Sequence, residues 1–145
     1  MAGFFFAFSV AVMTALAQQP PPAGMATMQA INIAVFNPVF GTAFTATPVL
    51  CVLVMIDSLL RWDEPDALCV LVGGTLYLIG TLGVTAMFNV PRNDALAAVQ
   101  PTAQGSAVLW SRYLREWTAW NHVRTAAAFA AAAWLTVALL GGVGK

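Results

Sequence analysis

The sequence contains very little charge. Charged residues make up 8% of its 145 residues and apolar residues 60%, whereas soluble domains carry about 25% charged residues. No charged side chain precedes Asp57, and a soluble segment of that length without charge would be hard to keep monomeric. The composition therefore predicts an integral membrane protein that forms a single domain over residues 1–145.

Several classes of site are also missing. Six basic and six acidic residues give a net charge of zero, so we expect no nucleic-acid partner. One histidine and two cysteines in separate apolar runs, Cys51 and Cys69, make a poor ligand set, so we expect no metal site. The glycine-rich loops that bind dinucleotides or phosphates are absent, so we expect no bound cofactor.

Four apolar runs dominate what is present. A bilayer core of about 30 Å needs about 20 apolar residues in a helix, and the runs predict membrane helices near residues 2–17, 39–61, 67–88 and 118–143. The first is short for a span. Interfacial helices are expected near 24–36 and 106–117, with polar loops at 61–66 and 89–105. The predicted fold is all-α: a membrane four-helix up-down bundle with additional interfacial amphipathic helices.

The segment at 106–117 has a helical period. Trp110, Tyr113, Leu114 and Trp117 fall on one face, and charged residues fall on the other. This pattern is typical of a helix with its aromatic residues at the depth of the lipid headgroups. Nothing before Leu140 interrupts the helical pattern, so this helix is compatible with an unbroken run into the last span.

The polar residues of the apolar chain are strongly one-sided. Alternating spans place the first and third connections on the same membrane face, and these connections hold most of the asparagine, the histidine and much of the arginine. We therefore expect a pocket open to that face, floored by Tyr77 and Thr81, beside aromatic residues that would stack on a flat ligand. Its expected rim and aromatic residues are Asn32, Asn37, Asn89, Asn93, Asp94, Asn121, His122, Arg124, Trp117 and Trp120.

Simpler structural roles stay open for the same residues. The threonines can bond to carbonyls of their own helix, the asparagines can cap helices or form turns, and the tryptophans can form an interfacial belt. Arg124 can extend to lipid phosphates. His122 lies about 140° around the helix from Trp117, which leaves open whether it faces the asparagines.

Five segments resemble a known family. They are Phe4–Met13, Met28–Asn32, Asn37-Pro38, Asn89–Asp94 and Trp117–Thr125, and together they resemble the anthrone oxygenase-like family of small membrane proteins, mostly of unknown function. Thr14 stands where we would expect proline in that family's first helix. The resemblance implies, for some fungal members, conversion of anthrones to anthraquinones with O₂ and without flavin or haem.

Two functional hypotheses follow. The first is a cofactor-independent oxygenase or oxidase of a planar phenolic, anthrone-like or quinol-like molecule, with His122 as base and Arg124 and Asn121 as oxyanion donors. The alternative is a non-catalytic membrane protein that binds a lipid, a quinone or a protein partner, and self-association stays open. Counting arginines, with Arg61 and Lys145 on the opposite face, predicts a multi-pass protein of the cell membrane whose motif face is cytoplasmic.

Overall fold

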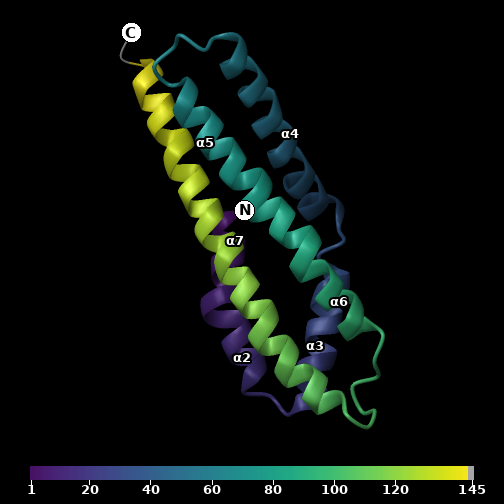
Figure 1. The fold of residues 1–145 in the computed structure, drawn as a ribbon. Coiled ribbons are helices and arrows are strands. Elements are labelled where there is room, and N and C mark those ends of the chain that lie inside the picture. The colour runs from purple at the N-terminus through teal and green to yellow at the C-terminus, as the bar shows by residue number, and fades with distance from the viewer. Residues whose placement is uncertain (144–145) are drawn as a thin grey trace.

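The structure, a computed structural model, describes residues 1–143 and contains helices and no strands over that range (Figure 1). Lys145, which entered the predicted orientation, lies outside the described residues. The predicted all-α class is confirmed. The α-helices are α1 (Ala2–Ala7), α2 (Met13–Ala17), α3 (Pro21–Ala34), α4 (Pro38–Leu60), α5 (Ala67–Tyr77), α6 (Val90–Ala97) and α7 (Ser106–Val143), and the π-helical segments are η1 (Phe8–Val12), η2 (Leu78–Gly83) and η3 (Thr85–Asn89).

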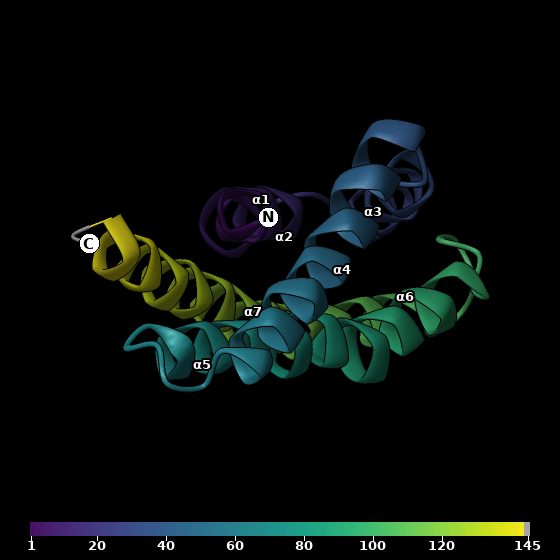
Figure 2. The same cartoon turned by 90° about the horizontal axis from the view of Figure 1, so that it is seen from above.

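Two long antiparallel helical runs form the frame of the molecule. One passes from α5 through η2 and η3 into α6, and the other is α7, whose 38 residues measure about 57 Å. Figure 1 shows α4 beside α5 at one end, with α2 and α3 toward the other end, and Figure 2 shows the same layers from above. The contacts of α1, α2 and α3 with α7 place residues 2–34 against that helix.

Three helices are long and apolar enough to cross a membrane: Pro38–Leu60, Ala67–Ala97 and Ser106–Gly141. The first apolar helix, Ala2–Ala17, is shorter. The structure therefore supports three candidate spans, while a fourth span and the up-down four-helix bundle stay predictions. The helix α4 buries little of its surface, and its exposed valines and leucines are the side chains expected against lipid.

A pair of glycines brings the candidate spans close together. A Cβ atom on Gly73 would lie 2.8 Å from Leu135 Cγ of α7, and one on Gly74 would overlap Met55 Sδ of α4. Small residues let helix backbones approach closely where lipid offers no hydrophobic driving force. Adjacent glycines on α5 therefore fix its contacts with two different helices.

The aromatic face predicted for residues 106–117 is present, but other helices cover it, so it does not face lipid. Trp110, Tyr113 and Trp117 are buried in a core that also contains Met25 and Leu96, and their depth in a membrane stays a prediction. They are buried because α2, α3 and α6 all pack on this face of α7. The helix continues without interruption into the last apolar run, as its sequence allowed.

The segment from Asn89 to Ala97, expected as part of a loop, is helical. Pro91 lies in the first turn of α6, directly after the wider π-helical turn of η3. A proline in a first turn removes an N–H that would lack a partner there, so it does not break the helix. Arg92 Nη1 donates to the carbonyl oxygen of Phe88 at 2.8 Å across this junction.

Candidate functional site

Arg124 lies at the centre of the polar motifs and is buried, with 6% of its surface exposed. Its Nε donates to Asn121 Oδ1 at 2.8 Å and its Nη1 to Thr85 Oγ1 at 3.2 Å. The guanidinium carbon lies 4.3 Å from the ring centroid of Phe5 and 5.0 Å from that of Trp117. Within residues 1–143 it forms no ion pair with a carboxylate, so its charge is held by neutral groups and aromatic rings.

Asn121 holds this arginine and the first helix together. Its side chain is fully buried, and Nδ2 donates to the carbonyl oxygen of Phe5 at 2.9 Å and to Ser9 Oγ at 2.6 Å. Ser9 Oγ also lies 3.2 Å from Thr125 Oγ1. Because the amide uses both its donor and acceptor ends, it orients the Arg124 guanidinium relative to α1.

All three π-helical segments meet α7 near this point. Ser9 of η1 bonds Asn121, Thr81 of η2 donates to the carbonyl oxygen of Arg124 at 3.4 Å, and Thr85 of η3 accepts from the Arg124 side chain. Asn89, at the end of η3, donates from Nδ2 to the carbonyl oxygen of Trp117 at 3.2 Å. Single wide turns are frequent at functional sites, where they redirect a side chain.

Arg124 borders a cavity of about 410 Å³, which we call the aromatic cavity. It lies where the junction between α3 and α4 meets α1 and α7. Apolar and aromatic side chains form most of its wall, and Arg124 is the only charged residue among them. The lining residues are Phe4, Phe5, Phe8, Met28, Ile31, Asn32, Val35, Phe36, Asn37, Phe40, Gly41, Phe44, Thr45, Thr85, Val90, Asn93, Trp117 and Arg124.

One wall of the aromatic cavity is built from phenylalanine rings of two helices. Phe4 of α1 lies 4.9 Å from Phe40 of α4 between ring centroids, and Phe40 stacks on Phe44 at 5.8 Å. Phe4 also lies 5.0 Å from Phe8. Such a wall favours flat, apolar ligands.

Two buried nitrogen atoms of lining residues have no hydrogen-bond partner: Asn32 Nδ2 and Trp117 Nε1. An unpaired buried donor costs roughly 1–3 kcal/mol. Behind the wall the acceptor Asn89 Oδ1 is also buried without a partner, so Arg124 is the group that gives the cavity wall its positive charge.

The structure brings together many of the residues singled out from the sequence. Asn32, Asn37, Asn93, Trp117 and Arg124 all line the aromatic cavity. Asn37 also caps α4, because its Oδ1 accepts from the Phe40 N–H at 3.0 Å, and Asn93 Oδ1 accepts from the Tyr113 hydroxyl at 2.8 Å. Asn121 and Asn89 lie behind the wall, where they bond Arg124 and Trp117 respectively.

Other expected members of the site lie elsewhere. Tyr77 packs with Cys51 and Ala131, and Thr81 bonds the backbone of α7, so neither forms the predicted cavity floor. Trp120 stacks on Phe88 at 3.5 Å, outside the cavity lining. Asp94 is exposed.

His122 does not line the aromatic cavity, and this answers the question that the sequence left open, namely whether it faces the asparagines. It is exposed and lines a separate outer groove of about 500 Å³ between α2 and α7, beside Met13, Arg115 and Thr118. Two residues along a helix correspond to a rotation of about 200°. The geometry that directs Arg124 inward therefore directs His122 to the opposite side of α7.

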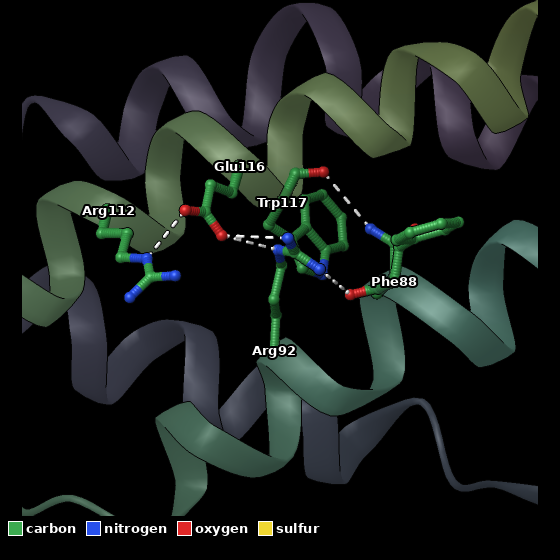
Figure 3. A network of polar contacts seen from close by, with 6 residues as sticks. Phe88, Arg92, Arg112, Glu116 and Trp117 are labelled. Atoms are coloured by element: carbon green, nitrogen blue, oxygen red, sulfur yellow. Dashed lines mark hydrogen bonds and ion pairs between the residues drawn. The ribbon is translucent and has the colours of Figure 1, made fainter.

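A charged network fastens α6 to α7 beside the site (Figure 3). Arg92 Nε donates to Glu116 Oε2 at 3.0 Å, and Arg112 Nε donates to Glu116 Oε1 at 2.7 Å. Figure 3 also shows the carbonyl oxygen of Trp117, which accepts from Asn89. This network occupies the carboxylate of Glu116, so the acid nearest in sequence to Trp117 pairs with other arginines.

Two residues that hold the helices around the site together, Ser9 and Gln29, were not predicted from the sequence. Ser9, the first hydroxyl of the first apolar run, bonds Asn121. Gln29 Nε2 donates to the carbonyl oxygens of Leu96 at 2.8 Å and Val99 at 2.9 Å, and so ties α3 to the end of α6. Ser9 could have been found because it is an isolated polar residue in an apolar run, which suggests a polar partner inside the protein. The partners of Gln29 are distant in sequence and gave no such signal.

The fold and the buried cation define a class of helical protein with membrane-capable helices and a mostly apolar cavity. The sequence profile of the anthrone oxygenase family matches residues 1–134, and the chain belongs to that family. No curated protein and no solved structure matches it.

Proposed function

We propose that this chain is a multi-pass membrane oxygenase or oxidase that acts on a planar phenolic, anthrone-like molecule. The observation that carries the proposal is a buried arginine without a carboxylate partner at the edge of an aromatic, mostly apolar cavity. A cation in such a place favours a ligand that carries or develops negative charge on oxygen. Membership of the anthrone oxygenase family supports the same substrate class.

The reaction needs no protein redox group. An anthrone is oxidised at its methylene carbon and O₂ is reduced, so that one oxygen atom becomes the new carbonyl of the anthraquinone and the other leaves as water. The substrate supplies the electrons once it has lost a proton and become electron-rich. The role left to the protein is to bind the flat ring system, exclude water and stabilise the oxyanion.

The roles we assign follow the geometry. Phe4, Phe40 and Phe44 would contact the rings, Arg124 would face the substrate oxygen, and Asn32 would offer a further donor. Asn121 and Thr85 are positioning residues, because they touch Arg124. We do not assign the role of base to His122, since it lies in the outer groove.

The test is O₂ uptake by the purified protein in detergent with a hydroxylated anthrone, with anthraquinone formation followed by absorbance. Protein-dependent uptake above autoxidation in empty micelles, lowered about 10²–10³-fold in Arg124→Gln, is the expected result. The matched control is Arg115→Gln, which removes an exposed arginine of the same helix.

A non-catalytic lipid-binding or quinone-binding protein is the competing outcome. Mass spectrometry of the purified protein would then detect a retained phospholipid or quinone, and uptake would equal that of empty micelles. That result would reject the oxygenase.

A further inference from the structure

We infer that the aromatic cavity binds its phenolic ligand in the ionised form, with Arg124 as the counter-charge and without a proton-accepting side chain. The inference rests on the proposed function for the class of ligand. It goes further in assigning the ionisation to the field of one buried cation rather than to general-base catalysis.

The positive charge of Arg124 is not balanced by a carboxylate in the part of the chain that the structure describes. Two of its nitrogens donate to neutral oxygens of Asn121 and Thr85, and its plane lies against aromatic rings. These bonds use Nε and Nη1, and the residue lines the aromatic cavity. A buried cation in an apolar site is stabilised by an anion, and the protein supplies none there.

The wall of the aromatic cavity contains no basic side chain that could accept a proton. Among the lining residues only Arg124 carries a titratable side chain, and neither α1 nor α3 carries a charged residue. On α7 and α6, the Tyr113 hydroxyl donates to Asn93, Glu116 pairs with Arg92 and Arg112, and Asp94 and His122 lie outside the cavity lining. No side chain on the wall is therefore suited to accept the ligand proton.

Two side chains on the cavity wall offer hydrogen-bond donors and no acceptor. The guanidinium of Arg124 and the indole Nε1 of Trp117 can only donate hydrogen bonds, and Nε1 has no partner. Donors are suited to a ligand oxygen that only accepts, which is the state of a phenolate or enolate.

The chemical step is a simple ionisation. The ligand O–H or acidic C–H bond breaks, its electron pair stays on the ligand as the oxyanion beside Arg124, and the proton passes to water at the mouth of the cavity. Nothing is oxidised or reduced in this step, so binding and ionisation can be measured without O₂.

The experiment uses 2-hydroxyanthraquinone, whose visible absorbance changes when its hydroxyl ionises and which carries no oxidisable methylene. The dye is titrated with pH in the presence of the purified full chain in detergent and in empty micelles of the same detergent. An opposite charge within about 4–6 Å lowers the pKa of an acid by about one to three pH units. We expect that shift with the wild-type protein, its loss in Arg124→Gln, and partial retention in Arg124→Lys.

Two exposed residues of α7 provide controls, His122→Ala and Arg115→Gln, both of which should keep the full shift. Absence of saturable binding, a bound dye that titrates as it does in micelles, or a shift that survives in Arg124→Gln would overturn the inference. So would loss of the shift in His122→Ala. If Arg124→Gln fails to fold, the wild-type titration and Arg124→Lys decide.

The outcomes separate the inference from the proposed function. A shifted dye without anthrone-dependent O₂ uptake rejects the oxygenase and keeps the anion site. O₂ uptake without a shift rejects the anion site and keeps the oxygenase.

Discussion

At the residue scale, the polar motifs act as one connected unit around Arg124. Asn121 accepts from the guanidinium and donates to α1, while Thr85 accepts from the other side. Charged-to-neutral hydrogen bonds of this kind contribute roughly 1.5–3 kcal/mol each. The arginine therefore depends on neutral neighbours for its position, and those neighbours are as important to the site as the charge itself.

Asn121→Ala tests that dependence. It removes two donor contacts to the first helix and one acceptor for Arg124, so that buried polar groups lose partners. We expect a loss of about 2–4 kcal/mol in stability, since each unpaired group costs about 1–3 kcal/mol. Thermal unfolding in detergent measures it. Gln104→Ala in the exposed loop before α7 is the control, and equal melting temperatures for the two variants would contradict the role given to Asn121.

At the scale of elements, three wide helical turns face one stretch of α7. η1, η2 and η3 each present a hydroxyl or amide there, from Ser9, Thr81, Thr85 and Asn89. A π-helical turn shifts the register of the side chains that follow it. The polar residues of two different helical runs can in this way converge on one level of a third helix.

The packing of α5 against α7 gives a prediction at this scale. Gly73→Leu places a Cβ atom 2.8 Å from Leu135 Cγ and 3.2 Å from the Ala131 carbonyl oxygen. Overpacking of this kind costs about 1–3 kcal/mol, so the variant should unfold at a lower temperature in detergent. Gly141→Ala is the control, because nothing lies within 4 Å of its added Cβ. A melting temperature at or above wild type for Gly73→Leu would show that the helices do not approach as closely as described.

At the scale of the whole molecule, the loops at residues 61–66 and 98–105 lie at opposite ends of the two long helical runs (Figure 1). The helices between them are long and apolar enough to cross a membrane. We therefore propose that these loops face opposite sides of the membrane. The excess of arginine near residues 92–124 predicts a cytoplasmic position for the second loop.

Single cysteines at exposed Asp63 and Gln104 test this topology, in a chain whose native thiols are removed by Cys51→Ala and Cys69→Ala. A membrane-impermeant maleimide added to intact cells should label the residue-63 variant and spare the residue-104 variant. After lysis both variants should react. Labelling of both from outside would refute a membrane span over Ala67–Ala97, and labelling of the residue-104 variant alone would reverse the orientation.

The sequence by itself determined the helical class, the apolar runs and the grouping of the polar motifs. These properties depend on composition and on the order of residues along the chain, so the hydropathy pattern predicts them. The alternation of the apolar runs predicted that Asn32 and Asn37 lie on the same side as Asn93 and Arg124. In the structure all four residues line one cavity. The family resemblance was confirmed over residues 1–134.

Only the tertiary structure decided which side chains are buried and in which direction they point. Trp110 and Trp117 became core residues because α2, α3 and α6 cover their face, and periodicity cannot tell a covered face from one that meets lipid. Likewise, the neighbours of α7 decide which of its sides is enclosed. The enclosed side holds Arg124 and Asn121, which left the most reactive side chain of the motif, His122, on the outer groove.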